Sequence, residues 1–180
     1  KDRLGNVDSL KAYNKGDGFE LITPHLKIYK NKSISSSRIR RYLSQGNLKA
    51  ASKCLGRDYM ISGTVVSGEK LGRELGYPTA NITLEHDYPL NGIYLSKVII
   101  DDEKYFGLAS VGNKPTFKGK EKLLEVFILD FDNNIYGKKI YIHFLEQIRK
   151  QVKFDSKDGL IKQMNEDYKY AIINSKKYGI

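Results

Sequence analysis

Residues 92–112 read GIYLSKVIIDDEKYFGLASVG, two runs rich in apolar and β-branched residues separated by a short acidic stretch. Runs of this kind, bounded by Gly, Pro, Asn or Asp, are typical of short β-strands. Six short strands in about 90 residues predict a small antiparallel barrel, because a barrel closes its own sheet edges. The six expected strands are residues 59–67, 80–84, 92–101, 104–112, 123–131 and 139–145.

Helices are expected on both sides of these strands. Serines at 35–37 can cap a helix start, and Gly46 would end that helix. A second short helix is expected over residues 48–55, and residues 19–22 are a further strand candidate. A third helix would run over residues 156–173 from a serine cap. Its buried face would consist of Leu160, Ile161, Met164, Tyr168 and Ile172.

The chain has 180 residues and a formal net charge of +10, and the excess is concentrated near its start. Residues 1–58 hold 13 basic and 5 acidic residues, whereas residues 59–180 hold 18 and 16. A basic nucleic-acid module would carry its excess on the folded bulk, so nucleic acid is not the expected partner. Residues 1–58 have few large apolar side chains, which suggests the tail of a larger domain.

Several other classes of protein are disfavoured by the composition. No apolar run approaches the ~18 residues of a membrane span, and the first residues lack the apolar core of a signal peptide. The single cysteine, Cys54, excludes an internal disulfide and fits a reducing cytoplasm. His25, His86 and His143 stand far apart in the sequence. We therefore expect a cytoplasmic protein with no membrane partner and no metal held by His or Cys.

The segment 68–81, GEKLGRELGYPTAN, is the first candidate site. Its glycines let backbone N–H groups approach phosphate oxygens, and a basic side chain neutralises charge. Thr79 and Asn81 alternate at a strand start and would face one side, where a hydroxyl and an amide oxygen suit Mg²⁺. An ordinary mobile hairpin loop explains the spacing equally well. The phosphate-binding candidates are Gly68, Gly72, Arg73 and Gly76.

Three further candidates carry charge or cap a helix. Glu125 is the one charged residue in the run 123–129, as a general base would be, although an edge glutamate paired with lysine also fits. Arg149 at a strand end could clamp an anion or be a solvated terminus. Arg38 and the preceding serines, Ser36 and Ser37, could bind phosphate at a helix N-terminus or form a plain cap.

These segments together resemble riboflavin kinases. Residues 68–81 are similar to that family's signature loop, and the resemblance extends over about residues 57–175. Its later blocks are residues 113–117, 124–131, 135–137, 149 and 153–156. Residues 1–57 resemble the end of the FMN adenylyltransferase module that precedes the kinase in bifunctional bacterial FAD synthetases. The expected domains are therefore 1–57, a remnant of that module without its ATP-binding His-x-Gly-His element, and 58–180, the kinase.

The resemblance implies a mainly β fold: a six-stranded antiparallel Greek-key barrel with a C-terminal α-helix, preceded by a short α/β remnant of a nucleotidyltransferase domain. The implied reaction moves the γ-phosphate of ATP to the riboflavin 5′-hydroxyl with Mg²⁺, giving FMN, and the parent enzyme would also adenylylate FMN to FAD. A flavin-binding or single-stranded nucleic-acid-binding barrel without catalysis is the alternative. The oligomeric state stays open.

The resemblance also assigns roles to residues. Thr79 and Asn81 would hold Mg²⁺ and phosphate, beneath a nucleotide flap. Glu125 would accept the hydroxyl proton, and Arg149 would lie near the flavin. The acid often found two residues after that arginine is Gln151 here. The flap residues would be Gly68, Gly72, Arg73 and Gly76, and the adenylyltransferase remnant would include Ser36, Ser37 and Arg38.

Overall fold

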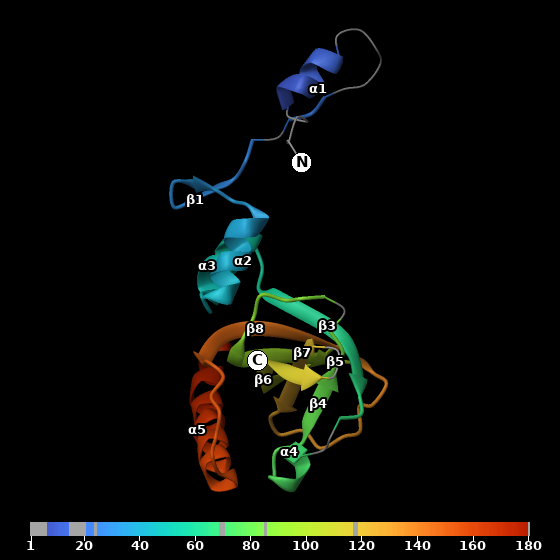
Figure 1. Cartoon of the computed structure of the whole chain (residues 1–180), viewed down its shortest axis with the longest axis vertical. Coiled ribbons are helices and arrows are strands. Elements are labelled where there is room, and N and C mark those ends of the chain that lie inside the picture. The colour runs from blue at the N-terminus through green and yellow to red at the C-terminus, as the bar shows by residue number, and fades with distance from the viewer. Residues whose placement is uncertain are drawn as a thin grey trace. The chain divides into compact units, whose positions relative to one another are not determined.

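The computed structural model describes residues 7–14, 21–23, 25–68, 71–84, 86–116 and 119–179 (Figure 1). The chain divides into two compact units, Lys1–Ile34 and Ser35–Ile180. The first unit contains helix α1 (Val7–Tyr13) and a hairpin of two short strands, β1 (Ile28–Tyr29) and β2 (Lys32–Ser33).

The strand predicted at residues 19–22 is wrong for residues 21 and 22. Residues 19 and 20 lie outside the described residues, and Leu21 and Ile22 are not in a strand. A strand needs a partner for its backbone groups, and within the described part of this unit β1 and β2 pair with each other. Two apolar residues alone did not make a strand here.

The second unit begins with the two predicted helices. Helix α2 (Ser36–Ser44) is capped by Ser35, whose side chain accepts from the backbone N–H of Arg38 at 3.3 Å. Helix α3 (Leu48–Leu55) ends at Gly56, which has a left-handed φ of 73°. Leu43 and Leu48 from these helices belong to the same buried cluster as the barrel interior. The boundary between the two compact units therefore falls before α2. The predicted boundary after residue 57 separates segments of different evolutionary origin, and it stays a prediction.

The barrel predicted from the strand pattern is confirmed. Six antiparallel strands close in the order β3-β4-β7-β6-β5-β8. Strand β8 lies beside β5 after the consecutive strands β5, β6 and β7, which is the Greek-key arrangement. The strands are β3 (Tyr59–Val66), β4 (Thr79–Ile82), β5 (Gly92–Ile100), β6 (Glu103–Thr116), β7 (Gly119–Ile128) and β8 (Lys139–Arg149).

Some element bounds differ from the sequence pattern. Strands β6 and β7 pair as far as Thr116 and Gly119, because backbone hydrogen bonds continue where the side chains are polar. At its other end, strand β7 stops at Ile128 rather than at residue 131, where its pairing with β6 and β4 has ended. The expected loop between β3 and β4 contains a one-turn helix, α4 (Leu71–Glu74), that the sequence analysis did not predict.

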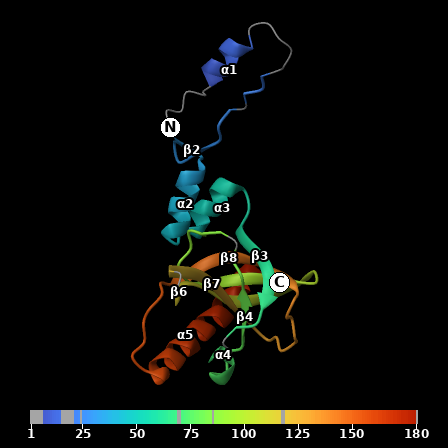
Figure 2. The same ribbon diagram turned by 45° about the vertical axis from the view of Figure 1, so that its right-hand side comes forward.

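Apolar side chains fill two separate layers of this unit. The barrel interior holds fully buried residues such as Tyr94, Leu124 and Phe144. A second cluster, which includes Leu95 and Leu108, lies on the outer face of the barrel beneath helix α5 (Lys157–Ser175). Helix α5 runs alongside the barrel in both ribbon views (Figures 1 and 2). The outer face is therefore partly covered, and its polar residues stand beside a packed helix.

The C-terminal helix begins at its predicted Ser156 cap and ends two residues later than expected. Its predicted face is partly wrong: the five apolar residues are half-buried, and the fully buried ones include Asp167 and Ala171. Among the helices that the structure describes, none combines the length and hydropathy needed to cross a bilayer. The chain ends in a short 3₁₀ helix, η1 (Lys176–Tyr178).

Candidate active site

The start of strand β4 brings two predicted site residues against a third. Asn81 pairs directly with Glu125 of β7, and Thr79 pairs with Phe127 two positions along. Directly opposed residues of antiparallel strands share a face, with Cβ atoms about 5 Å apart. Thr79, Asn81 and Glu125 therefore lie on the outer face of the barrel. Asn81 is 8% exposed and Glu125 is half-buried.

The line of opposed residues that begins with Asn81 and Glu125 continues across the sheet to the candidate Arg149. Glu125 is opposed on its other side by Ser110 of β6, which is opposed by Ile93 of β5. Ile93 in turn pairs with Arg149 of β8. We call the residues Asn81, Glu125, Ser110, Ile93 and Arg149 the outer row. Three candidates predicted from separate parts of the sequence thus lie along one line of the sheet.

The flap glycines lie close to the β4 residues. A Cβ added to Gly68 would come within 2.2 Å of the Asn81 amide nitrogen, so this position requires glycine unless the amide moves. A Cβ on Gly72 would come within 3.3 Å of the Thr79 hydroxyl and 2.4 Å of the Tyr77 carbonyl oxygen. Backbone from two flap positions is therefore in contact range of the predicted metal- and phosphate-binding side chains.

A small cavity confirms that several predicted residues are neighbours. It has a volume of about 20 Å³ and brings Gly68 and Arg73 to the same space as Thr79 and Asn81. Its remaining lining residues are Pro78 and Tyr136, the latter 47% exposed. The sequence analysis noted residues 135–137 as a family block but did not place Tyr136 in the site. Gly76, with a φ of 84°, is absent from this lining.

A larger cavity of about 460 Å³ adjoins the same residues. Arg73, Thr79 and Tyr136 line both cavities, and the larger one extends along the β7–β8 connection, residues 131–136. Val65, Val126 and Ile128 from the barrel strands form apolar wall. A cavity of this size, with both apolar and polar groups in its lining, is typical of small-molecule sites.

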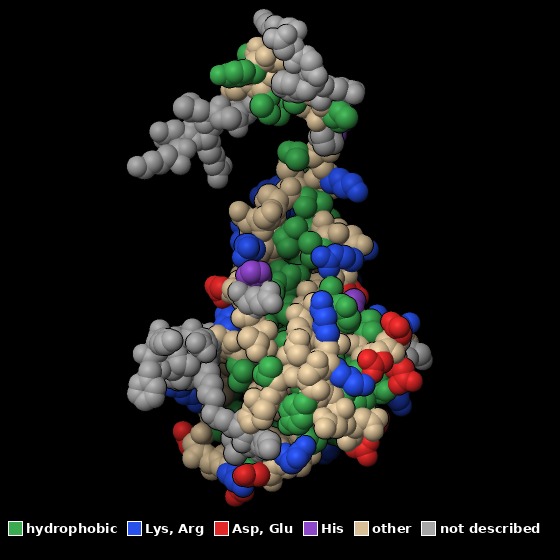
Figure 3. Space-filling view, turned by 90° about the vertical axis from the view of Figure 1, so that its right-hand side faces the viewer, with side chains coloured by type: hydrophobic (Ala, Val, Ile, Leu, Met, Phe, Trp, Pro, Cys, Tyr) green, Lys and Arg blue, Asp and Glu red, His purple; other side chains and the backbone are tan. Residues whose placement is uncertain are grey.

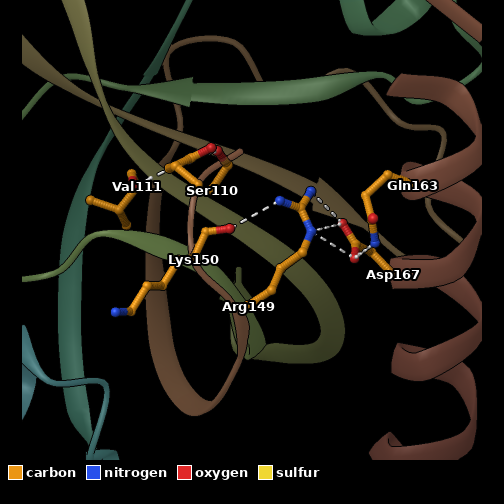
Figure 4. Close-up of polar contacts among 7 residues, drawn as sticks. Ser110, Val111, Arg149, Lys150, Gln163 and Asp167 are labelled. Atoms are coloured by element: carbon orange, nitrogen blue, oxygen red, sulfur yellow. Dashed lines mark hydrogen bonds and ion pairs between the residues drawn. The ribbon is translucent and has the colours of Figure 1, made fainter. Parts of the chain in front are cut away.

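Arg149 has an acidic partner that the sequence analysis did not find (Figure 4). Its Nε lies 3.0 Å from both carboxylate oxygens of Asp167, and its Nη2 donates to Oδ2 at 2.8 Å. Asp167 is 5% exposed and also accepts from Gln163 at 3.1 Å. The guanidinium additionally lies 5.9 Å from the centre of the Phe154 ring. The interpretation of Arg149 as a solvated strand end is therefore wrong.

Gln151 contacts the outer row directly. Its side-chain nitrogen donates to the Ser110 hydroxyl at 3.0 Å and to the Val111 carbonyl at 3.3 Å. Ser110 is the residue opposite Glu125. Ser110 thus lies between the neutral Gln151 amide and the candidate base Glu125. An acid in place of Gln151 would add a second negative charge near Glu125.

The predicted adenylyltransferase residues are positioned as a helix start. Ser36 and Ser37 are exposed, whereas Arg38 is 8% exposed. The Arg38 guanidinium donates to the Tyr42 hydroxyl from Nε at 3.1 Å and from Nη2 at 2.9 Å. These contacts support the alternative of a capped helix whose arginine packs locally. They do not test whether the segment derives from an adenylyltransferase.

The fold and the site define a Greek-key barrel with an oxygen-rich site on its outer face, next to a small-molecule-sized cavity. Among protein families, riboflavin kinase (Flavokinase) matches residues 55–173. This match covers more than half of the chain. The chain therefore belongs to the riboflavin kinase family.

Individual relatives agree with this family. A bifunctional riboflavin kinase/FMN adenylyltransferase of Buchnera aphidicola subsp. Schizaphis graminum is 40% identical, over 92% of this chain and 54% of that protein. The protein of the same description from Haemophilus influenzae is 39% identical, over 94% of this chain and 56% of that protein. The chain thus spans about half the length of the curated relatives it matches.

A solved structure is similar over the same extent. It is described as the crystal structure of a macrolide-efflux protein from Streptococcus pneumoniae, with a TM-score of 0.77 and 40% identity. The similarity covers 91% of this chain and 54% of that chain. It supports the architecture derived above.

Proposed function

We propose that this chain transfers the γ-phosphate of ATP to the 5′-hydroxyl of riboflavin, giving FMN and ADP. Membership of the riboflavin kinase family supports the substrates. The observation that carries the proposal is the direct pairing of Asn81 with Glu125, next to Thr79 and the flap glycines. This arrangement puts a carboxylate beside two neutral oxygen ligands on one face.

The proposed step balances with these residues in stated roles. The riboflavin 5′-oxygen attacks the γ-phosphorus, the bond from that phosphorus to the β,γ-bridging oxygen breaks, and ADP leaves. Glu125 accepts the hydroxyl proton as the new bond forms. Phosphoryl transfer relies mostly on positioning and charge stabilisation, so the remaining residues act by holding phosphate. Gly68 and Gly72 offer backbone, and Arg73 offers positive charge.

Mg²⁺ fits the oxygen donors of this site. Thr79 and Asn81 would hold it together with ATP phosphate oxygens, because Mg²⁺ binds few protein ligands and keeps several waters. Among the described residues there is no group of three or more His, Cys, Asp or Glu side chains that could hold a metal ion. When bound, the ion would neutralise the developing phosphate charge.

The larger cavity and the outer row suggest separate places for the nucleotide and for riboflavin. The 460 Å³ cavity is lined by Arg73 and Thr79, which makes it the candidate space for the nucleotide. The outer row leads away from that cavity toward Arg149, which is held against helix α5 by Asp167. We propose that riboflavin lies along this side, with Arg149 near the flavin.

A binding protein without catalysis is the alternative proposal. A flavin-binding barrel would need the pocket but not the Asn81–Glu125 pair. A single-stranded nucleic-acid-binding barrel would need a basic face with aromatic residues. The face of the barrel unit in Figure 3 carries basic and acidic side chains interspersed, which argues against the nucleic-acid-binding alternative.

The activity of the whole protein is a separate proposal. The bifunctional descriptions of the relatives suggest that a longer parent also adenylylates FMN to FAD, with residues 1–57 derived from the end of that module. Its partners would be small molecules, and the single cysteine of the present 180 residues is consistent with our proposal of a cytoplasmic location.

The proposal is tested by incubating the purified 180-residue chain with riboflavin, ATP and Mg²⁺ and separating the flavins by chromatography. FMN without FAD is the expected product. The matched control omits Mg²⁺ and adds a chelator, which should abolish FMN formation. Riboflavin that binds but is never phosphorylated would favour the binding-protein alternative, and FAD formation would contradict the assignment of residues 1–57 as a remnant.

A further inference from the structure

Tyr77 connects the flap segment to helix α5 across 88 positions of sequence. Its hydroxyl donates to the side-chain oxygen of Asn165 at 2.6 Å. Tyr77 stands two residues before Thr79, at the point where the chain leaves α4 and enters β4. The contact therefore joins the predicted nucleotide side of the site to the helix that carries Asp167.

The Tyr77 ring is also held by two other aromatic rings. It meets Phe127 edge-on at 5.2 Å between centres, and Tyr168 of α5 at 6.4 Å. Phe127 and Tyr168 lie 6.2 Å apart, so the three rings touch mutually. Phe127 is the direct partner of Thr79 across the β4–β7 ladder. We call Tyr77, Phe127, Asn165 and Tyr168 the Tyr77 clasp.

The backbone of Tyr77 is fixed from the other side. Its N–H donates to the carbonyl oxygen of Gly72 at 2.8 Å, which closes the turn after α4. Gly76 has a φ of 84° in that turn, a value that favours glycine. Pro78 follows and fixes its own φ before Thr79 begins the strand. Ring, hydroxyl and backbone therefore all constrain the same residue, whose neighbour in the site is Thr79.

The chemistry of Tyr77 suits a permanent hydrogen-bond donor. Burial raises its pKa, and the nearby Tyr168 and Asp167 raise it further. A tyrosine phenol is already protonated at neutral pH, so the Tyr77 hydroxyl can donate to Asn165 there. Asp167 also binds Arg149, so the clasp and the arginine share one segment of α5.

We propose that Tyr77 and Asn165 are positioning residues for the nucleotide: the clasp holds the flap turn and the start of β4 against α5, so that Thr79 and the flap glycines are pre-arranged for Mg-ATP. This inference rests on the proposed kinase function for its substrate. Because the Tyr77–Asn165 hydrogen bond lies at the turn that leads into Thr79, its loss should change nucleotide affinity rather than the rate of phosphate transfer. Preorganisation of a binding loop acts in this way.

The test compares Tyr77→Phe, Asn165→Ala and the double variant in the full 180-residue chain. Each single change removes one hydrogen bond, which corresponds to an approximately 3- to 10-fold rise in KM for Mg-ATP. We expect kcat and KM for riboflavin to stay within about 2-fold. The double variant should be no worse than the worse single variant, because both remove the same bond.

Two further variants separate positioning from simple stabilisation. Asn165→Asp keeps the acceptor oxygen and should retain a near-normal KM for Mg-ATP. Tyr170→Phe is the matched control, because its hydroxyl donates to Glu146 at 2.5 Å from the same helix without contacting the flap. We expect this control to change the melting temperature but not KM for Mg-ATP. Equal effects of Tyr77→Phe and Tyr170→Phe on KM would overturn the proposal.

Direct binding keeps this inference separable from the proposed function. Calorimetry with Mg²⁺ and a non-hydrolysable ATP analogue should show the same 3- to 10-fold weakening for Tyr77→Phe and Asn165→Ala. If the unmodified chain binds the analogue but makes no FMN, the kinase proposal fails and the clasp is still decided by these affinities. Unchanged affinities in both variants, or no nucleotide binding by the unmodified chain, would overturn the clasp.

Discussion

The two faces of strand β7 have different tasks, although they alternate residue by residue along the same strand. Leu124, Val126 and Ile128 point into the barrel and are at most 5% exposed. Glu125 and Phe127 point outward, where Glu125 opposes Asn81 and Ser110 and Phe127 contacts Tyr77. The inward face contributes apolar burial, and its Val126 and Ile128 also line the larger cavity, whereas the outward face presents the polar groups suited to chemistry.

Substitutions on the two faces should have different effects. The inward side chains are interchangeable in principle with others of similar volume, because burial and packing are what they supply. The outward side chains depend on chemical type and register, since a one-residue slip would bury Glu125 and expose Leu124. Stability and turnover should therefore respond to different faces of the same strand.

The largest expected effect is on the outer face. Glu125→Gln should lower kcat by about 10²- to 10⁴-fold while riboflavin binding persists, because the amide cannot accept the hydroxyl proton. Steady-state FMN formation and flavin fluorescence titration measure the two quantities. Glu103→Gln, which changes an exposed glutamate on β6, is the matched control and should retain full turnover. Full activity of Glu125→Gln would remove this residue as the base.

The inner face should respond in the opposite way. Leu124→Ala truncates a side chain with no exposed area and should reduce the free energy of unfolding by about 2–5 kcal/mol through lost burial and a cavity. Urea denaturation measures this change. At a temperature where the variant is folded, kcat should remain within about 2-fold of normal. A large loss of kcat with unchanged stability would break the division between the faces.

The contact between α5 and β8 should have an intermediate effect. Asp167→Asn keeps the shape of a buried side chain but removes the charge that Arg149 binds, and should destabilise the fold by about 2 kcal/mol. Chemical denaturation checks this value. Glu166→Gln on the same helix is exposed and should change stability by less than about 0.5 kcal/mol. Equal effects of the two variants would show that the ion pair contributes little.

The smallest expected effect is a pH dependence far from the site. The hydrogen bond from Tyr170 to Glu146 raises the pKa of Tyr170 to about 12. The folded state thus keeps a proton that the unfolded state loses near pH 10, so this stabilisation is complete below pH 10 and falls as the pH rises toward 12. Melting temperatures from pH 9 to 11 should fall less steeply in Tyr170→Phe than in the unmodified chain. An identical slope would contradict this origin.

Much of the barrel could be predicted because each strand carries a local signal. β-Branched and aromatic runs indicated the six strands. The polar ends of β6 and β7 could not be found in this way, because their pairing rests on backbone hydrogen bonds. The short helix α4 was missed because a four-residue turn has almost no periodicity.

The candidate site residues could be named from the sequence, but the contacts that connect them could not. Thr79, Asn81 and Glu125 were chosen for their chemistry, and the register then brought them together. Asp167 was missed because a charged residue in a helix is expected to be exposed. Its burial could be predicted only with knowledge of its partner, Arg149. The Tyr77–Asn165 contact was likewise invisible, since its two residues belong to segments with no shared sequence pattern.

Alternate faces of these strands separate proposed chemistry from stability, and two adjacent residues of β4 lie on the two faces. Asn81 faces the site, and Ile82 is fully buried in the barrel. KM for Mg-ATP and the free energy of unfolding would be measured for Asn81→Ala and Ile82→Val on the same samples.

We expect Asn81→Ala to raise KM for Mg-ATP by about 10-fold through loss of an oxygen ligand. Ile82→Val should leave that KM unchanged and reduce the free energy of unfolding by about 1 kcal/mol. An unchanged KM and Mg²⁺ requirement in Asn81→Ala, or a KM for Mg-ATP that rises equally in Ile82→Val, would contradict the account.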